Sequence, residues 1–261
     1  MNAGRCNAME GNVYDAIVVG AGPSGSTCAA LLAKEGVRVL LADREGFPRD
    51  KPCGDAVGGK ALNVLSSLGL LHSLAQKGFL RSSGIVFSSP NGTEVEIPLL
   101  EGGGEMSGGF VCRRKDFDAI LFQHAKKACK TLERSEVFDL IFDGTRVIGI
   151  KARGVDGKEE AYYAKVVVGA DGVNSVVARK TLCLAADPKH YASAVRAYYS
   201  GIDSLRGNIE VHFLRESMPG YFWIFPLSSH EANVGVGMLL SEVSKKRANL
   251  HRILERCLKS G

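Results

Sequence analysis

The residues whose spacing is most specific for chemistry are the glycines of Gly20-Ala21-Gly22-Pro23-Ser24-Gly25, which follow an apolar segment and precede an Ala/Leu-rich one. In a G-x-G-x-x-G sequence the first glycine permits a tight turn, and the second lets backbone approach a diphosphate. The third permits close packing of a helix on a strand. Backbone N–H groups at the start of that helix then point at the anion. The spacing predicts a site for the diphosphate of a nucleotide cofactor.

An acidic residue stands where such a site needs one for the sugar. Asp43 ends the second apolar segment, 23 residues after Gly20, and a carboxylate at this point accepts hydrogen bonds from ribose hydroxyls. A glycine-rich turn with a coincidental aspartate is the alternative, but it leaves the spacing unexplained. We expect a dinucleotide site, and this fingerprint does not separate FAD from NAD because both carry the same ADP half.

Three elements must position these residues: a strand over 14–19, a helix over 24–34 and a strand over 37–42. Their order and their continuous apolar character predict a βαβ unit with buried parallel strands. After residue 81 the pattern changes to short alternating segments with turn signals, which is typical of antiparallel strands. The further elements that we expect are a Gly-rich loop over 54–59, a helix over 60–71, strands over 84–88 and 93–97 joined by Pro90-Asn91-Gly92, a loop over 101–109, a strand over 110–113, a helix over 116–130, a hairpin over 135–151 around Asp143-Gly144, a strand over 166–168 and β structure from 192 to 240.

The element order predicts the fold class and the domain organisation. We expect an α/β protein in which a Rossmann-like nucleotide-binding domain with a parallel sheet is interleaved with a mainly antiparallel β domain. The first domain is expected over 12–80 and 110–186, and the second, a substrate domain incomplete at its C-terminus, over 81–109 and 187–261.

The composition indicates a folded protein and excludes several classes. Of 261 residues, 45% are apolar and 23% charged, close to globular averages. The net charge of +5 is modest and no nucleic-acid motif is present, so we expect no nucleic-acid partner. Seven scattered cysteines without C-x-x-C or metal-ligand spacing predict no metal site and a reducing compartment. The chain lacks a signal peptide and an apolar run of about 18 residues, so we expect a cytoplasmic protein.

The segment over 243–259 has the spacing of an amphipathic helix with a basic face. A solvated basic face over a buried apolar stripe is the expected arrangement. Peripheral contact with a membrane surface or an acidic partner is the alternative. The basic residues concerned are Lys245, Lys246, Arg247, His251, Arg252 and Arg256.

Several later segments share a pattern with known proteins. They are Asp43-Arg44-Glu45, Phe47-Pro48-Arg49-Asp50-Lys51-Pro52-Cys53-Gly54-Asp55, residues 111–118, Gly169-Ala170-Asp171-Gly172, Pro219-Gly220-Tyr221-Phe222-Trp223-Ile224-Phe225-Pro226 and Asn233-Val234-Gly235-Val236-Gly237. Together they resemble a group of flavoproteins that contains p-hydroxybenzoate hydroxylase-like monooxygenases and geranylgeranyl reductases. The Pro-Cys-Gly segment at 52–54 and the stretch from Pro219 to Gly237 are similar to the reductase branch. The resemblance covers residue 14 to about residue 240.

The resemblance implies FAD as the cofactor and a role for each matching residue. Around the ADP half it places Gly20, Gly22, Pro23, Ser24 and Gly25 at the diphosphate, Asp43 with Arg44 beside it at the ribose, the Val137 backbone at the adenine, and Asp171 and Gly172 near the diphosphate. Against the flavin it places Cys53, Gly54 and Ala56, with Arg114 reaching the cofactor.

Plainer interpretations stay open for some of these positions. Arg114 or its neighbour Arg113 also fits an ordinary surface arginine, and Arg113 is the alternative match to the family arginine. Cys53 also fits a buried, inert thiol, since free cysteine packs as a small hydrophobe. Asp171-Gly172 also fits a turn that closes the strand over 166–168.

An aromatic stripe lies in the segment similar to the reductases. On an extended strand Tyr221, Trp223 and Phe225 point to one side, and Phe222 and Ile224 to the other. From the residues alone, such a stripe is more typical of a core. The resemblance instead implies that Tyr221 and Trp223 lie at the reactive face of the flavin.

Isoprenoid reduction gives a reason for aromatic rings at that place. An isolated prenyl double bond has no carbonyl to polarise it, so hydride addition needs a proton, and positive charge develops on a tertiary carbon. Ring faces stabilise such a charge by about 2 kcal/mol when it is desolvated. Tyr221 and Trp223 are therefore predicted catalytic residues, with Cys53 as a candidate acid or positioning group.

The activity implied by the resemblance is FAD-dependent reduction of geranylgeranyl double bonds in lipid, quinone or chlorophyll side chains. The implied partner is an isoprenoid small molecule or lipid, and the implied electron donor is NAD(P)H or reduced ferredoxin. A nicotinamide would dock transiently, because the chain has no second G-x-G-x-x-G. The alternatives are an FAD- and NAD(P)H-dependent aromatic monooxygenase and a non-catalytic nucleotide-binding remnant.

The sequence departs from the family at one motif. Relatives carry a Gly-Asp-Ala-Ala-type motif after the substrate sheet, whereas the one Gly-Asp-Ala here, at 54–56, belongs to the earlier Cys-Gly loop. We therefore expect a C-terminally truncated reading frame whose product holds ADP weakly, fails to fix the isoalloxazine ring and is inactive.

Overall fold

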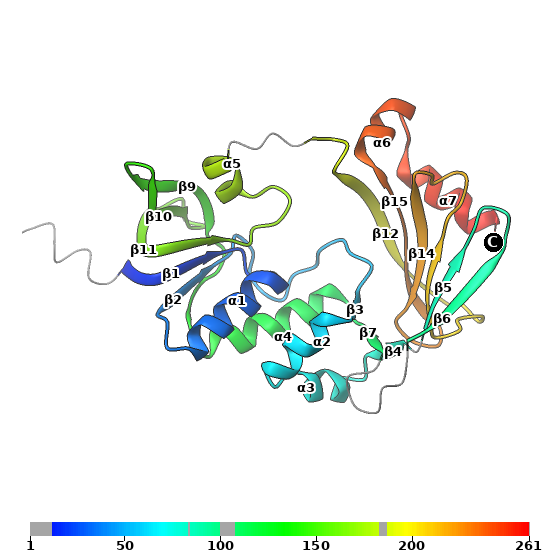
Figure 1. Cartoon of the computed structure of the whole chain (residues 1–261), viewed down its shortest axis with the longest axis horizontal. Coiled ribbons are helices and arrows are strands. Elements are labelled where there is room, and N and C mark those ends of the chain that lie inside the picture. The colour runs from blue at the N-terminus through cyan, green and yellow to red at the C-terminus, as the bar shows by residue number, and fades with distance from the viewer. Residues whose placement is uncertain (1–11, 83, 100–107, 183–186, 261) are drawn as a thin grey trace, which may run out of the picture. The chain divides into compact units, whose positions relative to one another are not determined.

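The computed structural model describes residues 12–82, 84–99, 108–182 and 187–260. Within it the chain divides into two compact units (Figure 1). The first unit comprises Met1–Arg49 and Lys115–Ala185, and the second comprises Asp50–Arg114 and Ala186–Gly261. Residues 50–80 thus pack with the second unit, although we expected them in the nucleotide-binding domain. The boundaries expected for the nucleotide-binding and substrate domains therefore stay a prediction. Cys6, Cys183 and residues 101–107 of the expected loop lie outside the described residues.

The first unit is built on a sheet whose described strands lie in the order β8-β2-β1-β11-β10-β9. β8, β2, β1 and β11 are parallel, and β10 and β9 continue the sheet as an antiparallel hairpin. The parallel strands follow the order third, second, first, fourth along the chain, which is a Rossmann order. The predicted fold class is confirmed. The strands are β1 (Val13–Val19), β2 (Val39–Ala42), β8 (Lys130–Leu132), β9 (Glu136–Asp143), β10 (Arg146–Arg153) and β11 (Glu159–Gly169).

Three helices lie wholly or mainly in the first unit: α1 (Pro23–Lys34), α4 (Arg114–Lys126) and α5 (Val176–Leu182). α1 connects β1 to β2 and packs against both, with the small side chains of Ala29 and Ala30 buried. The core contains Ile17, Leu40 and Ile150, each fully or almost fully buried. Burial of an aliphatic side chain of this size contributes about 1.5–3 kcal/mol.

The strand order reverses between β1 and β11. β1 leads into α1 through Gly20, and β11 leads through Ala170 towards α5. The two strand ends are joined there by the Ala170 N–H, which donates to the Val19 carbonyl at 2.7 Å. In open parallel sheets, ligands bind outside the carboxyl ends of strands at such a reversal. The fold therefore puts the predicted glycine turn at the expected position for a ligand site.

The second unit contains a small sheet with two helices beside it in the chain. β3 and β4 both pair antiparallel with β7. β3 lies within the segment expected as a Gly-rich loop. The expected helix over 60–71 ends earlier, at Ser67, because Gly69 at φ +70° takes a left-handed conformation just after it. A second helix begins at Leu71 and continues to Gln76. The elements are β3 (Ala56–Gly58), α2 (Lys60–Ser67), α3 (Leu71–Gln76), β4 (Leu80–Ser82) and β7 (Gly109–Val111).

The larger sheet of the second unit has the described order β12-β15-β14-β13-β5-β6. Its pairs are antiparallel except β13 with β5. This agrees with the mainly antiparallel domain that was predicted, and the expected hairpin around Pro90-Asn91-Gly92 is formed. The strands are β5 (Gly84–Ser88), β6 (Glu94–Pro98), β12 (Ala192–Ser200), β13 (Ile209–His212), β14 (Gly220–Pro226) and β15 (Glu231–Leu239).

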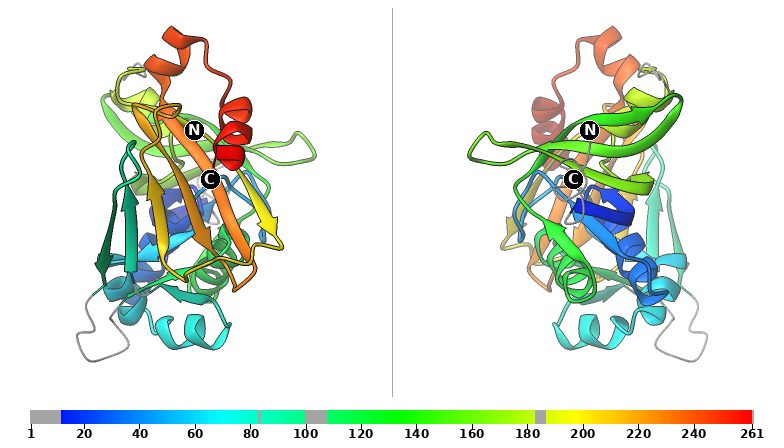
Figure 2. Two further views of the ribbon diagram at one scale, coloured as in Figure 1. Left: turned by 90° about the vertical axis from the view of Figure 1, so that its right-hand side faces the viewer. Right: turned by 90° about the vertical axis from the view of Figure 1, so that its left-hand side faces the viewer.

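The expected amphipathic helix over 243–259 is two helices, α6 (Leu240–Lys246) and α7 (Leu250–Ser260). The break lies at Arg247, which has φ +47° and caps α6, while the Ala248 N–H donates to the Val243 carbonyl. α7 lies on one face of the large sheet (Figure 2, left). Its apolar stripe packs there with Phe222, Val234, Val236 and Met238; the stripe consists of Leu250, Ile253, Leu254 and Cys257.

Candidate cofactor and substrate site

The glycine turn at the end of β1 has the shape that a diphosphate site requires. Gly20 has φ +95°, and a Cβ added to it would lie 2.4 Å from the carbonyl oxygen of Ala170. A Cβ at Gly25 would lie 1.7 Å from the carbonyl oxygen of Gly20. Backbone blocks both positions, so only glycine fits them. Both glycines therefore meet the steric requirements expected at the first and third positions of the motif, while their contact with a diphosphate stays a prediction.

The start of α1 is left open for an anion. Gly22 is the N-cap, Pro23 is the first helical residue, and no side chain of the described residues caps the helix. The first N–H groups of a helix lack intrahelical partners and attract negative charge. A Cβ at Gly22 would have one neighbour, the Arg49 guanidinium, at 3.4 Å. Ser24 is exposed beside it. The residues predicted at the diphosphate thus form one backbone cradle that a side chain at Gly22 would occupy.

The Asp43 carboxylate points at this turn. Its Oδ2 accepts from the Ala21 N–H at 2.5 Å, and its Oδ1 accepts from the Glu45 N–H at 2.8 Å. Each carboxylate oxygen keeps acceptor capacity beyond one hydrogen bond, so Asp43 can also accept from a ribose. Arg44 is mostly exposed and pairs with Glu45 at 3.5 Å.

Three further residues predicted near the ADP half lie in the first unit. Asp171 accepts from the Ser175 hydroxyl and the Val176 N–H, both at 2.6 Å, and so caps the start of α5. Gly172 has φ +78°. Asp171-Gly172 thus forms the turn that was the alternative prediction for this segment. Its contact with a diphosphate stays a prediction. Val137 is buried on β9 in the core of the sheet.

Arg49 and Asp118 form an ion pair that the sequence analysis did not assign. The Arg49 guanidinium contacts the Asp118 carboxylate at 2.5 Å; the Asp118 side chain is fully buried and that of Arg49 is 14% exposed. The pair fixes the guanidinium beside Gly22, at the open start of α1. The two residues are 69 positions apart, and the usable signal was the presence of both in segments that resemble the flavoproteins.

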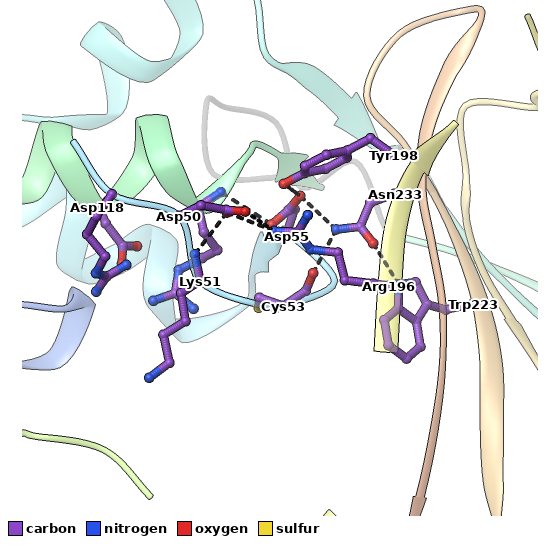
Figure 3. Close-up of polar contacts among 11 residues, drawn as sticks. Asp50, Lys51, Cys53, Asp55, Asp118, Arg196, Tyr198, Trp223 and Asn233 are labelled. Atoms are coloured by element: carbon purple, nitrogen blue, oxygen red, sulfur yellow. Dashed lines mark hydrogen bonds and ion pairs between the residues drawn. The ribbon is translucent and has the colours of Figure 1, made fainter. Parts of the chain in front are cut away.

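In the second unit, a buried carboxylate organises a polar network (Figure 3). Asp55 is 1% exposed, with φ +72°. Its Oδ2 accepts from Asn233 Nδ2 at 2.7 Å and from the Tyr198 hydroxyl at 2.9 Å, and its Oδ1 accepts from the Arg114 N–H at 3.3 Å. Asn233 Nδ2 also donates to the Cys53 carbonyl at 2.7 Å, and Asn233 Oδ1 accepts from the Trp223 indole N–H at 3.0 Å.

Burial sets the protonation of this network. Loss of solvent raises the pKa of Asp55, while its hydrogen bonds from Asn233 and Tyr198 act in the opposite direction. Burial, with the neighbouring Asp55 carboxylate, raises the pKa of the Tyr198 hydroxyl. Tyr198 therefore stays a proton donor to Asp55 at neutral pH. Two guanidinium groups lie over its ring, with Arg196 at 4.2 Å and Arg113 at 4.5 Å from the ring centroid.

The indole of Trp223 lies across a glycine of the neighbouring strand. A Cβ at Gly235 would be 2.2 Å from Trp223 Cζ2, whereas at Gly237 the nearest indole atom would be 3.7 Å away. Tyr221 and Phe225 flank the indole, with ring centroids 5.9 and 6.3 Å from its own. The predicted alternation is confirmed, because Phe222 packs with α7 on the other face.

The remaining predicted residues of this unit lie around the same network. The Phe225 ring packs on Gly54, where a Cβ would be 2.5 Å from it. Cys53 is half-buried and enters the network through its carbonyl, while Ala56 is exposed on β3. Trp223 is 5% exposed and Tyr221 43%. Of the two adjacent arginines, Arg113 pairs with Glu231 at 3.0 Å, and Arg114 contributes its N–H to Asp55.

Asp55, Asn233 and Tyr198 were missed as site residues. A signal existed for Asn233, which is two residues before Gly235 and four before Gly237, so that strand alternation puts it on the face of the two glycines. Glycine inside a strand often marks a site where a ligand or another backbone approaches closely, so a polar side chain on the same face is a candidate site residue. No such periodic signal marks Asp55 or Tyr198.

The comparison with known families decides the cofactor. Residues 13–249 match the family model described as FAD binding domain. The chain belongs to this FAD-binding family. Membership answers the question between FAD and NAD that the glycine fingerprint left open. Within the described residues, no group of three or more His, Cys, Asp or Glu residues is arranged to hold a metal ion. The helices described are too short or too polar to cross a bilayer.

The curated relatives compared with the chain are named as reductases. The chain is 34% identical over 238 residues to digeranylgeranylglycerophospholipid reductase of Methanosarcina acetivorans, a match that covers 90% of this chain and 56% of the relative. It is 34% identical over 241 residues to menaquinone reductase of Mycobacterium tuberculosis strain H37Rv, covering 90% of this chain and 57% of the relative. The chain therefore spans just over half the length of these relatives.

Solved structures of flavoproteins share the fold. The myxobacterial chondrochloren halogenase, a variant of FAD-dependent halogenases, superposes with a TM-score of 0.82 at 26% identity, over 95% of this chain and 58% of the halogenase. A geranylgeranyl bacteriochlorophyll reductase-like protein from Thermoplasma acidophilum also gives a TM-score of 0.82, at 24% identity, over 95% of this chain and 62% of that protein. The second likeness concerns the fold alone.

Proposed function

We propose that the protein is an FAD-dependent reductase of isoprenoid double bonds, acting on geranylgeranyl chains of lipids, quinones or chlorophyll precursors. The observation that carries this proposal is the aromatic face of β14, which Tyr221, Trp223 and Phe225 form together. Phe225 packs on Gly54 at one end of this face, and Asn233 links the Trp223 indole to the Cys53 carbonyl. The names of two relatives support the proposal: both are reductases, and each is 34% identical to this chain over the aligned region.

FAD fits the residues that would hold it. The Gly20–Gly25 backbone leaves a cradle that a side chain at Gly22 would fill, and the carboxylate of Asp43 faces the same turn. Bound FAD supplies hydride transfer once it is reduced. In the proposal, the N–H groups at the start of α1 bind the diphosphate and Asp43 accepts from the ribose.

The aromatic side chains have a role that follows from the substrate. Protonation of a prenyl double bond develops positive charge on carbon, and the ring faces of Tyr221 and Trp223 stabilise that charge while excluding water. The hydrogen bond from Trp223 to Asn233 holds one of these rings in place. Cys53 is the candidate acid or positioning group. Electrons come from NAD(P)H, docked transiently, or from reduced ferredoxin.

Membrane contact, in this proposal, is peripheral and electrostatic. The apolar stripe of α7 packs on the large sheet, so it is not free to enter a lipid interface. The basic side chains of α6 and α7 remain, and Lys246, Arg247, Arg252 and Arg256 line a groove of about 570 Å³. Each Lys or Arg near an anionic membrane contributes about 1 kcal/mol, and salt screens the attraction. Salt-sensitive sedimentation with anionic vesicles, and none with neutral vesicles, is the expected result.

The decisive experiment is an anaerobic assay of the purified protein. Dithionite-reduced, flavin-loaded protein is incubated with digeranylgeranylglycerophospholipid and with menaquinone, and products are analysed by mass. The proposal expects a mass gain of one hydrogen molecule for each double bond reduced. Oxygen-dependent NAD(P)H consumption stimulated by a phenol would instead identify an aromatic monooxygenase, and nucleotide binding without turnover would identify a non-catalytic remnant.

A further inference from the structure

We propose that Asp55 is a positioning residue that fixes the orientation of the Trp223 indole through the side chain of Asn233. The same amide ties the Cys53–Gly54 backbone to this carboxylate, so that one buried group sets the geometry of both. Any catalytic consequence rests on the proposed function. The structural claim, and the experiment that tests it, do not.

The orientation of the Asn233 amide is determined by its partners. A primary amide has two N–H donors on nitrogen and acceptor capacity on oxygen. Asn233 Nδ2 uses both donors, to Asp55 Oδ2 and to the Cys53 carbonyl, each at 2.7 Å. A rotated amide would set its oxygen against these two acceptors. Asn233 Oδ1 must therefore face the other way, where it accepts from Trp223 Nε1 at 3.0 Å.

Asp55 is itself held rigidly enough to act as the anchor. Its side chain accepts from the Tyr198 hydroxyl and the Arg114 N–H, and its carbonyl accepts from the Cys112 N–H at 2.9 Å. It is 1% exposed, and Asn233 is fully buried. Water therefore does not compete for the hydrogen bonds, and in a site of low dielectric each of them is stronger than in solvent.

The indole needs such a restraint because its neighbour is a glycine. At Gly235 no side chain limits rotation of Trp223, and the ring lies where a Cβ would be. The hydrogen bond to Asn233 is then the directional contact that selects one ring orientation. Figure 3 shows Asp55, Asn233 and Trp223 in sequence, linked by dashed lines.

A purely structural role and a positioning role predict different results. If the network only stabilises the fold, removal of the Asp55 charge changes the free energy of unfolding and leaves the folded-state environment of Trp223 as it was. If Asp55 positions the indole, that environment changes in protein that remains folded. Trp223 is the one tryptophan of the sequence, so intrinsic tryptophan fluorescence reports on this position alone.

The test compares Asp55→Asn with wild type, using the full chain at matched flavin content. An asparagine offers one acceptor oxygen, so it cannot serve both Asn233 and the Arg114 N–H as the carboxylate does. The expected result is a red-shifted Trp223 emission, stronger quenching by acrylamide and a weaker near-UV circular dichroism signal.

Glu231→Gln is the matched control. It also replaces a carboxylate by an amide, on β15, at a side chain that pairs with Arg113. This variant should behave as wild type. Wild-type emission and quenching in folded Asp55→Asn overturn the proposal.

A measurement on the wild type covers the case in which Asp55→Asn does not fold. Protonation of Asp55 removes acceptor capacity facing Asn233, so Trp223 emission should change as pH falls, before far-UV circular dichroism reports unfolding. Emission that stays constant until unfolding overturns the proposal. None of these outcomes depends on substrate, so they leave the proposed reductase function to its own assay.

Several charged or titratable groups lie around Asp55 and bear on this pH experiment. They are Tyr198 and Arg196 on β12, Arg113 just before α4, Arg114 at its start, and Asp50, which pairs with Arg196.

Discussion

Gly25 lies so close to Gly20 that a Cβ at position 25 would be 1.7 Å from the Gly20 carbonyl oxygen. The obstacle is backbone, which cannot rotate away as a side chain can. Gly25→Ala must therefore displace the start of α1 from the turn. Overpacking of this kind costs typically about 1–3 kcal/mol, and more where backbone is the obstacle. A fall in the free energy of unfolding measured with urea, together with loss of FAD binding, is the expected outcome.

Gly22→Ala should separate cofactor binding from stability. The one neighbour of the new methyl group is the end of the flexible Arg49 side chain at 3.4 Å, so the fold accommodates it. The methyl group would nevertheless occupy the cradle at the start of α1. We expect a wild-type unfolding midpoint and a weaker FAD affinity, measured by titration of flavin fluorescence. An unchanged affinity would show that the diphosphate lies elsewhere.

The first-unit site was predictable because its determinants are contiguous. The turn, the helix start and Asp43 lie within 24 residues, and each carries a local signal in glycine spacing or strand character. The same is true of the hairpin β9–β10. By contrast, β8 (Lys130–Leu132) is three residues long, which is too short to show a period. No strand was predicted there, and the expected helix over 116–130 runs past the end of α4 at Lys126 into the first residue of β8.

The second-unit network could not be predicted from the sequence because its contacts are long-range. Asp55 and Asn233 are 178 positions apart, and Asp55 and Tyr198 are 143 apart. Strand alternation gives the face on which Trp223 lies but not the partner of its N–H group. The break at Arg247 was missed for another reason: the left-handed conformation there is adopted by a residue that rarely does so.

Arg49→Ala should destabilise the first unit. The change removes the guanidinium from Asp118, whose side chain is fully buried. Loss of one member of a buried ion pair costs roughly 3–5 kcal/mol, and the partial exposure of Arg49 puts the expected loss towards the lower end of that range. Arg153→Ala is the matched control, because it removes an exposed pair with Glu159 and should cost about 1 kcal/mol or less. Equal losses in urea unfolding would contradict the assignment.

Gly235→Ala and Gly237→Ala form a matched pair on β15. A methyl group at Gly235 would lie 2.2 Å from the indole and 2.6 Å from the Val195 carbonyl, whereas at Gly237 the nearest atom is 3.6 Å away. We expect Gly235→Ala to move Trp223 and to break its hydrogen bond with Asn233, which shifts tryptophan emission. Gly237→Ala should leave emission as in wild type. In the reductase assay, kcat should fall for the first variant alone.

The pH dependence of stability should reveal the buried charge of Asp55. Burial raises its pKa in the folded protein above the ordinary value of 3.8, so the folded state binds this proton more tightly than the unfolded state. The associated stability is fully present below 3.8 and is lost as pH rises through the raised pKa. Free energies of unfolding in urea, measured across this range, should therefore fall with rising pH in wild type relative to Asp55→Asn.

Asp139→Asn is the control in which the pH dependence of stability has the opposite sign. The hydrogen bond from Lys180 lowers the pKa of Asp139. Wild type should therefore lose stability relative to this variant as pH falls below 3.8. A parallel pH profile for wild type and Asp55→Asn would mean that Asp55 is solvated, and the network built on it would then lack its anchor.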